Sequence, residues 1–180
     1  MRHVLPAFVL LLAGCGGPVV THIQNDDRAL VSSLFRYGAA DGEMAVEVHG
    51  IPSGIDPGLY AAEVAAGLEA PFWLPRVRFQ PVAHGAATFR MVLLIGAPVS
   101  AGGKQACEAP EAVGLFPMAA PLRVQGAMCS DDRALTSAVG TLNPPPEGPR
   151  DPRFRALLFQ LTWALLPEER YADNVVELSP

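Results

Sequence analysis

A regular alternation of apolar and polar side chains occupies residues 43–49. The apolar Met44 and Val46 would lie on one face of the predicted strand. Glu47 and His49 would lie on the other face, because neighbouring side chains of a strand point in opposite directions. This segment is therefore predicted to be a strand with one face in the core.

Three further segments have the pattern of strands. Residues 76–80 alternate, and residues 88–95 begin with alternation and end in a continuous apolar run. Such a run is typical of a central strand that is covered on both faces. Residues 122–128 are also predicted to be a strand, and Cys129 follows them directly.

Helices are predicted where an Asp-Pro pair precedes an apolar periodic segment. The pairs at 56–57 and 151–152 place an N-capping carboxylate before a proline at the first helical position. The helices are expected to cover residues 57–68 and 152–166. A shorter helix, capped by Asp26, is expected to end near Gly38.

The last predicted helix is apolar over most of its circumference. Its second apolar face includes Phe159, Trp163 and Leu166, beside the stripe expected to face the core. A helix of this kind is either buried or presents a surface to a partner. These three residues are therefore candidates for a partner surface.

Two polar or small-residue segments separate these elements. Residues 96–120 are rich in Gly, Pro and Ala and are expected to form a long loop, and residues 130–132 are expected to cap a short helix. The order of elements predicts an α+β domain over residues 26–180. It would have a small, mostly antiparallel sheet of about four strands, with two or three helices packed on one face.

The N-terminus has the organisation of an export signal. Arg2 precedes an apolar run at residues 4–12, which is too short to span a bilayer. The run ends in the sequence Leu12-Ala13-Gly14-Cys15. These residues resemble the lipobox of bacterial lipoproteins, in which an aliphatic residue and two small residues precede a cysteine.

The resemblance implies that Cys15 receives a diacylglycerol through a thioether and that cleavage occurs before it. Residues 1–14 would then be a signal peptide and residues 15–25 a lipidated tether, with acyl chains such as palmitate in the membrane. Gly16 stands where an aspartate often marks inner-membrane retention. In a Gram-negative cell the protein would therefore be held at the outer membrane, facing the periplasm. The remainder of the chain resembles no characterised family.

Charge and cysteine content indicate which partners are unexpected and how the chain is cross-linked. The formal net charge is −5, and Lys104 is the only lysine, so nucleic acid is not an expected partner. Cys107 and Cys129 form an even pair in an exported protein and predict a disulfide, with two free thiols as the alternative. Neither lies in a C-x-x-C motif, which disfavours a redox role.

The sequence contains no pattern that predicts catalysis, a cofactor or a metal. Walker, G-x-S-x-G and H-E-x-x-H spacings are absent, and the acid pairs at 26–27, 131–132 and 168–169 are explained as features of helix ends. His49 and His84 are expected to be solvated, and they would form a metal site only if the fold brought them together.

Two functional hypotheses follow. The first is a non-enzymatic module of the cell envelope that binds another envelope protein or supports envelope assembly. The alternative is a small-molecule-binding or hydrolytic domain, in which His49, His84 and an acidic residue line a deep pocket.

Overall fold

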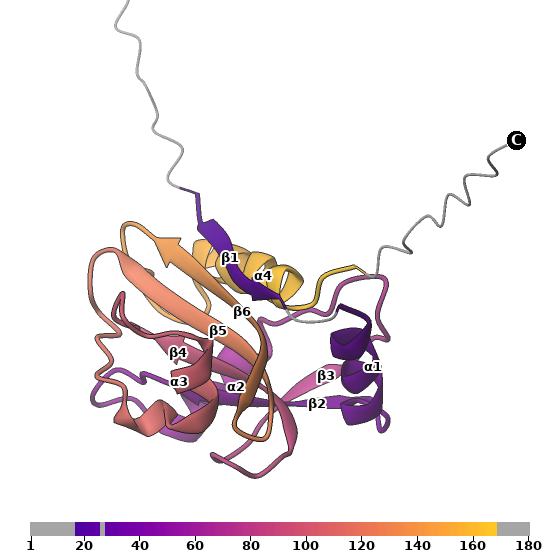
Figure 1. The fold of residues 1–180 in the computed structure, drawn as a ribbon. Helices are drawn as coiled ribbons and strands as arrows, with labels where there is room; N and C mark the ends of the chain where they lie inside the picture. Colours follow the sequence, from indigo (N-terminus) through magenta and orange to yellow (C-terminus); the bar gives the residue numbers. More distant parts are fainter. Residues whose placement is uncertain (1–16, 26–27, 169–180) are drawn as a thin grey trace, which may run out of the picture.

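The fold is α+β, with a mixed six-stranded sheet and four α-helices (Figure 1), which confirms the predicted class. The computed structural model describes residues 17–25 and 28–168. The strands are β1 (Val19–Asn25), β2 (Glu43–His49), β3 (Arg78–Pro81), β4 (Phe89–Ile95), β5 (Leu122–Ser130) and β6 (Arg133–Leu142). The helices are α1 (Arg28–Gly38), α2 (Pro57–Ala65), α3 (Gly103–Glu108) and α4 (Pro152–Leu165), with a 3-10 turn η1 (Pro110–Ala112).

The sheet has the strand order β1-β6-β5-β4-β2-β3. Strand β2 pairs in parallel with both β3 and β4, and the other neighbours are antiparallel. The prediction of about four strands in a mostly antiparallel sheet was therefore wrong in these details. The strands missed by the sequence reasoning are β1 and β6.

Strand β1 occupies residues 19–25, which were predicted to belong to the tether. It pairs antiparallel with β6, from Val19 opposite Thr141 to Asn25 opposite Thr136, with an irregularity between His22 and Gln24. An edge strand needs a partner on one side only, and its backbone hydrogen bonds do not depend on a strong apolar pattern. Val19, Val20 and Ile23 are residues typical of strands, but the position of this segment directly after the predicted anchor led to its assignment to the tether.

Residues 130–132 connect a hairpin and do not cap a helix, contrary to the prediction. Asp131 has a φ of 49°, and the following residues pair with β5 from Ser130 opposite Arg133 onward. Strand β6 is built largely from Ala, Ser, Thr and Gly, so its alternation is weak in the sequence although most of it is buried. The acid pair at 131–132 thus lies in a turn between two strands.

The core is divided between the two faces of the sheet. The side chains of β4 alternate: Phe89, Met91, Leu93 and Ile95 join the larger cluster, whereas Val92 and Leu94 join a smaller one. The larger cluster, on what we call the first face, contains apolar side chains of α1, α2 and α4. The smaller cluster, on the second face, contains Ala106 and Cys107 of α3.

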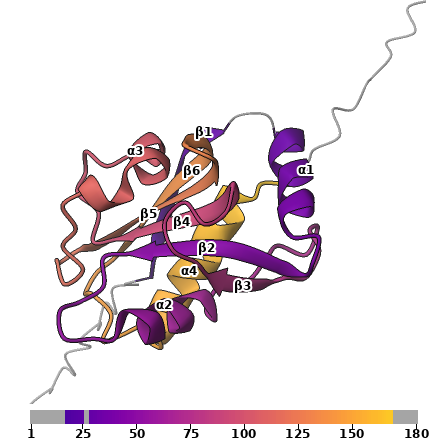
Figure 2. The same ribbon diagram turned by 90° about the horizontal axis from the view of Figure 1, so that it is seen from below.

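Helices therefore cover both faces, and not one face as predicted (Figures 1 and 2). Helix α3 packs against β4, β5 and β6. It lies within residues 96–120, where the high content of Gly, Ala and Pro indicated a loop. Small residues allow this short helix to approach the sheet closely, as at Gly103, where an added Cβ would lie 2.6 Å from Ser137 Cβ.

The predicted disulfide is confirmed. Cys107 of α3 is joined to Cys129 of β5, with a Cα–Cα distance of 5.6 Å, and both residues are buried. The bond fastens the segment that follows β4 to the second face of the sheet. In the chain-entropy model, closing a loop of this size stabilises the fold by about 3 kcal/mol.

The two Asp-Pro helix starts are also confirmed. Asp56 Oδ1 accepts a hydrogen bond of 2.7 Å from Leu59 N, and Asp151 Oδ1 accepts one of 2.8 Å from Arg153 N. The cap expected at Asp26 and the lipobox lie outside the described residues. No helix within residues 17–25 and 28–168 has the length and apolar content needed to cross a membrane.

Candidate functional site

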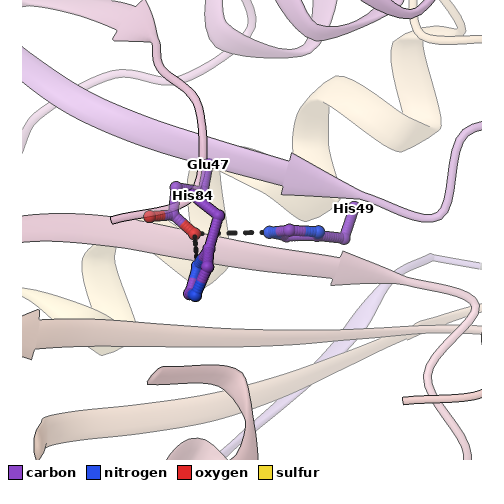
Figure 3. A group of neighbouring side chains, drawn as sticks. All are labelled: Glu47, His49 and His84. Atoms are coloured by element: carbon purple, nitrogen blue, oxygen red, sulfur yellow. Dashed lines mark hydrogen bonds and ion pairs between the residues drawn. The ribbon is translucent and has the colours of Figure 1, made fainter. Parts of the chain in front are cut away.

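Glu47, His49 and His84 come together on the second face of the sheet (Figure 3). Glu47 and His49 lie two positions apart on β2, and His84 lies in the connection from β3 to β4. Glu47 Oε2 is 3.3 Å from His49 Nε2 and 3.0 Å from His84 Nδ1. We call these three residues the Glu-His-His cluster.

The other oxygen of Glu47 is held separately. Glu47 Oε1 accepts a hydrogen bond of 2.9 Å from Gly85 N and lies 2.5 Å from Arg90 Nε. Burial by itself raises the pKa of Glu47, but hydrogen bonds to His49, His84 and Gly85 N and the charge of Arg90 together lower it to about 2. The carboxylate is therefore ionised at neutral pH although it is only 1% exposed.

Arg90 is itself buried, on β4, with its side chain 2% exposed. Its Nη1 donates to the carbonyl oxygen of Asp131 at 2.8 Å, and its Nη2 donates to that of Cys107 at 3.1 Å. The contact between Arg90 Nε and Glu47 Oε1 is an ion pair. It does not count as a hydrogen bond, because the N–H group does not point at the oxygen. Arg90 thus connects Glu47 to the hairpin turn and to the disulfide-bonded helix α3.

The imidazoles form the open side of the cluster. The side chain of His49 is 20% exposed and that of His84 is 39% exposed. Glu111 of η1, mostly in solvent, places its Oε2 at 3.7 Å from His84 Nε2. Solvent can therefore reach the two imidazole rings, while the buried carboxylate fixes their positions from below.

The sequence placed Glu47 and His49 on one strand face but did not identify Glu47 as a site residue. Their alternation was the available signal. His84 is 35 positions further along the chain than His49, and only the parallel pairing of β2 with β3 and β4 brings it close. The expectation of two separate solvated histidines was therefore incomplete.

His49 and His84 were expected to line a deep pocket. The main apolar cavity of the described residues is elsewhere, and neither histidine lines it. That cavity, of about 740 Å³, is lined by other residues, among them Tyr60, Phe116 and Leu122. The Glu-His-His cluster lies instead on the second face near Glu111 of η1, with both imidazoles partly exposed. This arrangement suits a small ion better than a large organic ligand.

A second notable group is an aromatic cluster formed by Phe72, Trp73, Phe159 and Trp163. The ring centroids of Trp73 and Trp163 are 4.9 Å apart, as are those of Phe159 and Trp163. Phe72 contacts both tryptophans and is 81% exposed. The cluster joins α4 to the segment that precedes β3.

The predicted partner surface is thus divided by the fold. Phe159 is 37% exposed and Trp163 is half-buried, whereas Leu166 is only 1% exposed. Leu166 belongs to the core of the first face, so its assignment to a partner surface was wrong. Its carbonyl oxygen accepts a 3.2 Å hydrogen bond from Trp73 Nε1. Phe72, which was not among the predicted residues of this surface, is the most exposed ring of the cluster.

Comparison with protein-family models, curated proteins and solved structures finds no match to this chain.

Proposed function

We propose that this protein is a lipid-anchored protein of the cell envelope, and that its domain is a non-enzymatic module which rests on the membrane surface through the aromatic cluster. The observation that carries the proposal is the short distance along the chain between the lipobox cysteine and the element next to α4. Only residues 16–18 separate Cys15 from β1.

This short connection limits how far the domain can move from its anchor. The four Cα–Cα steps from Cys15 to Val19 span at most about 14 Å when the chain is fully extended. Strand β1 packs beside α4, the helix that carries Phe159 and Trp163 (Figure 1). An acylated Cys15 would therefore hold the domain close to the bilayer. Val19, the first residue of β1, lies opposite Thr141 near the first half of α4, and Trp163 lies in the second half of that helix.

The composition of the aromatic cluster suits the interfacial layer of a membrane. Tryptophan is enriched there because its ring is largely apolar but has a polar N–H group. The tryptophan N–H groups are turned into the protein, since Trp73 Nε1 donates to Leu166 O and Trp163 Nε1 is buried, so the surface that lipid can reach consists mainly of Phe72 and the exposed part of Phe159. Contact with lipid would remove Phe72 from water without a protein partner.

The disulfide supports the same location. Disulfides persist mainly in oxidising compartments outside the cytoplasm. The bond between Cys107 and Cys129 is therefore compatible with an exported domain. Cys15 is the one remaining cysteine of the sequence, so lipidation of its thiol does not use a cysteine of the disulfide.

The anchor is tested by metabolic labelling. Labelled palmitate should enter the wild-type protein and should not enter Cys15→Ser, since the thioether requires the thiol. Equal labelling of the two proteins would contradict the anchor. Cys107→Ser serves as the matched control, because it removes a cysteine of the fold and should retain the label.

The membrane contact is tested on the full lipidated chain in phosphatidylcholine vesicles. Trp73 and Trp163 are the only tryptophans, so the emission reports on the aromatic cluster alone. Lipids brominated near the headgroup end of the acyl chain should quench it. The variant Phe72→Gln should reduce quenching, and Phe116→Gln, which changes an exposed ring outside the cluster, should not.

Unquenched emission in vesicles would overturn the membrane contact. Protection of the same tryptophans by a second envelope protein, measured with a water-soluble quencher, would then identify a protein as the occupant. The labelling result is independent of both measurements, so the anchor and the membrane contact can fail separately.

A further inference from the structure

We infer that Glu47, His49 and His84 form a binding site for one divalent transition-metal ion of the zinc type. The inference is independent of the proposed membrane function, because the cluster lies on the second face of the sheet and uses none of the residues of the aromatic cluster. It rests on the positions of three ligand atoms and on the groups that hold them.

The ligand atoms are already close to the spacing that a metal requires. One atom from each side chain can be chosen so that all lie within 4.8 Å of one another (Figure 3). At metal–ligand distances of 2.0–2.1 Å, two ligands of a tetrahedral zinc ion are about 3.3 Å apart. The distances from Glu47 Oε2 to His49 Nε2 and His84 Nδ1, 3.3 and 3.0 Å, match this edge. The ligand atoms together span up to 4.8 Å, so a movement of one imidazole would close the remaining edge around an ion.

The carboxylate is oriented by groups that would remain outside the metal's ligand shell. Gly85 N and Arg90 Nε both hold Glu47 Oε1, so that Oε2 is directed toward the imidazoles. Arg90 is fixed in turn by the carbonyl oxygens of Asp131 and Cys107. Such supporting contacts set the orientation of metal ligands and are a normal part of metal sites.

The kind of ligand selects the kind of metal. Mg²⁺ and Ca²⁺ prefer several oxygen ligands, whereas imidazole nitrogen suits Zn²⁺, Cu²⁺ and Ni²⁺. The cluster supplies two imidazoles and one carboxylate, and Arg90 already neutralises much of the charge of that carboxylate. The imidazoles would therefore provide most of the attraction, which favours a transition metal over a hard cation.

The exposed side of the cluster allows an ion to enter, and water can occupy the coordination positions that the three side chains leave free. His49 and His84 are reached by solvent, and Glu47 is not. Glu111 stands near the outer nitrogen of His84, with 3.7 Å between Glu111 Oε2 and His84 Nε2. At this distance it is not hydrogen-bonded to the ring, and a small side-chain movement would let it accept the ring N–H, as carboxylates do around many zinc-bound histidines.

The same three side chains could instead form only a hydrogen-bonded network. In that case each imidazole donates an N–H to Glu47 Oε2, and no ion is needed. Glutamine in place of histidine distinguishes the two states, because its amide can still donate to the carboxylate but is a poor ligand for zinc. A purely structural network would tolerate that change without any effect on zinc.

The test is calorimetric titration of ZnCl₂ into the EDTA-stripped full chain in detergent. We expect one Zn²⁺ per chain for the wild type. The double variant His49→Gln/His84→Gln should bind at least about tenfold more weakly, since loss of supporting contacts alone costs tenfold or more. The matched control His22→Gln removes a histidine of β1, at the opposite edge of the sheet, and should bind like the wild type.

A measurement without substitutions guards against a variant that does not fold. In the ¹⁵N-labelled wild type, one equivalent of Zn²⁺ should shift the ring nitrogen resonances of His49 and His84 and leave those of His22 in place. A wild-type Kd above about 1 mM would overturn the inference. Unchanged zinc affinity in the double variant, or unshifted rings at His49 and His84, would overturn it as well.

Discussion

The Glu-His-His cluster and the aromatic cluster differ in how much of their chemistry is completed within the chain. In the first, every polar atom of Glu47 has partners, and buried Arg90 is fixed by three backbone carbonyls. In the second, Phe72 is mostly in solvent and Phe159 is partly exposed. The polar site is therefore preorganised by the fold, whereas the apolar surface is completed only by contact with something else.

The largest expected effect tests whether the polar site also supports the fold. Arg90→Met leaves the buried carboxylate of Glu47 without its ion partner, and breaking a buried pair in this way costs about 3–5 kcal/mol. Urea unfolding measures the change. Arg78→Met is the control, because Arg78 pairs with Glu43 at the surface and its loss should affect stability far less. Equal effects of the two variants would contradict the difference in burial.

The second prediction concerns the covalent link behind the polar site. Cys107→Ser should lower the free energy of unfolding by about 3 kcal/mol, because the denatured chain is no longer constrained. Urea unfolding of the wild type with and without a reductant should give a matching loss. Resistance of the reduced wild type to this loss would indicate that packing of α3 alone fixes the segment.

The third prediction concerns α4, which carries half of the aromatic cluster. Asp151→Ala removes the N-cap of this helix and should cost about 1 kcal/mol. Hydrogen bonding to Arg153 lowers the pKa of Asp151 to about 2. A lowered pKa stabilises the fold above the unfolded value of 3.8, and this contribution is lost as the pH falls toward 2.

The acid-induced part of the loss should therefore be smaller in Asp151→Ala than in the wild type. Urea midpoints at pH 6, 4, 3 and 2 measure this difference. Parallel pH profiles of the two proteins would show that Asp151 does not contribute in this way.

The smallest expected effect is that of Phe72→Gln on stability. Because the ring is 81% exposed, the change should alter the free energy of unfolding by no more than about 0.5 kcal/mol. The loss of quenching in vesicles, predicted above, should still be observed. A destabilisation of several kcal/mol would instead assign Phe72 to the core and remove the contrast between the two clusters.

The elements with strong local signals were predicted well from the sequence. Strand 43–49 and the Asp-Pro starts of α2 and α4 depend on side chains that are close in sequence. Strands β1 and β6 were missed because their pairing is supplied by neighbours far away in the chain. The position of α3 on the second face likewise depends on tertiary packing. Small residues allow this packing, but their presence in the sequence does not predict it.

The candidate sites show the same division. The pair Glu47 and His49 was visible as an alternation, but its third member, His84, requires the parallel arrangement of β2, β3 and β4. Phe159 and Trp163 were visible on the helix, whereas the contribution of Phe72 comes from another segment. The burial of Leu166 was not predicted because two apolar stripes on one helix do not show which of them faces the sheet.

The hydrogen bond from Arg90 to the carbonyl oxygen of Cys107 connects the covalent link of the second face to the polar site. It joins the disulfide to the carboxylate through a single side chain, since Arg90 contacts both Cys107 O and Glu47 Oε1. Without the disulfide, α3 would be held by its packing against β5, together with the carbonyl group that accepts from Arg90 Nη2. The disulfide thus fixes the chain at one of the carbonyl groups that position Arg90, and through Arg90 it is connected to the carboxylate of Glu47.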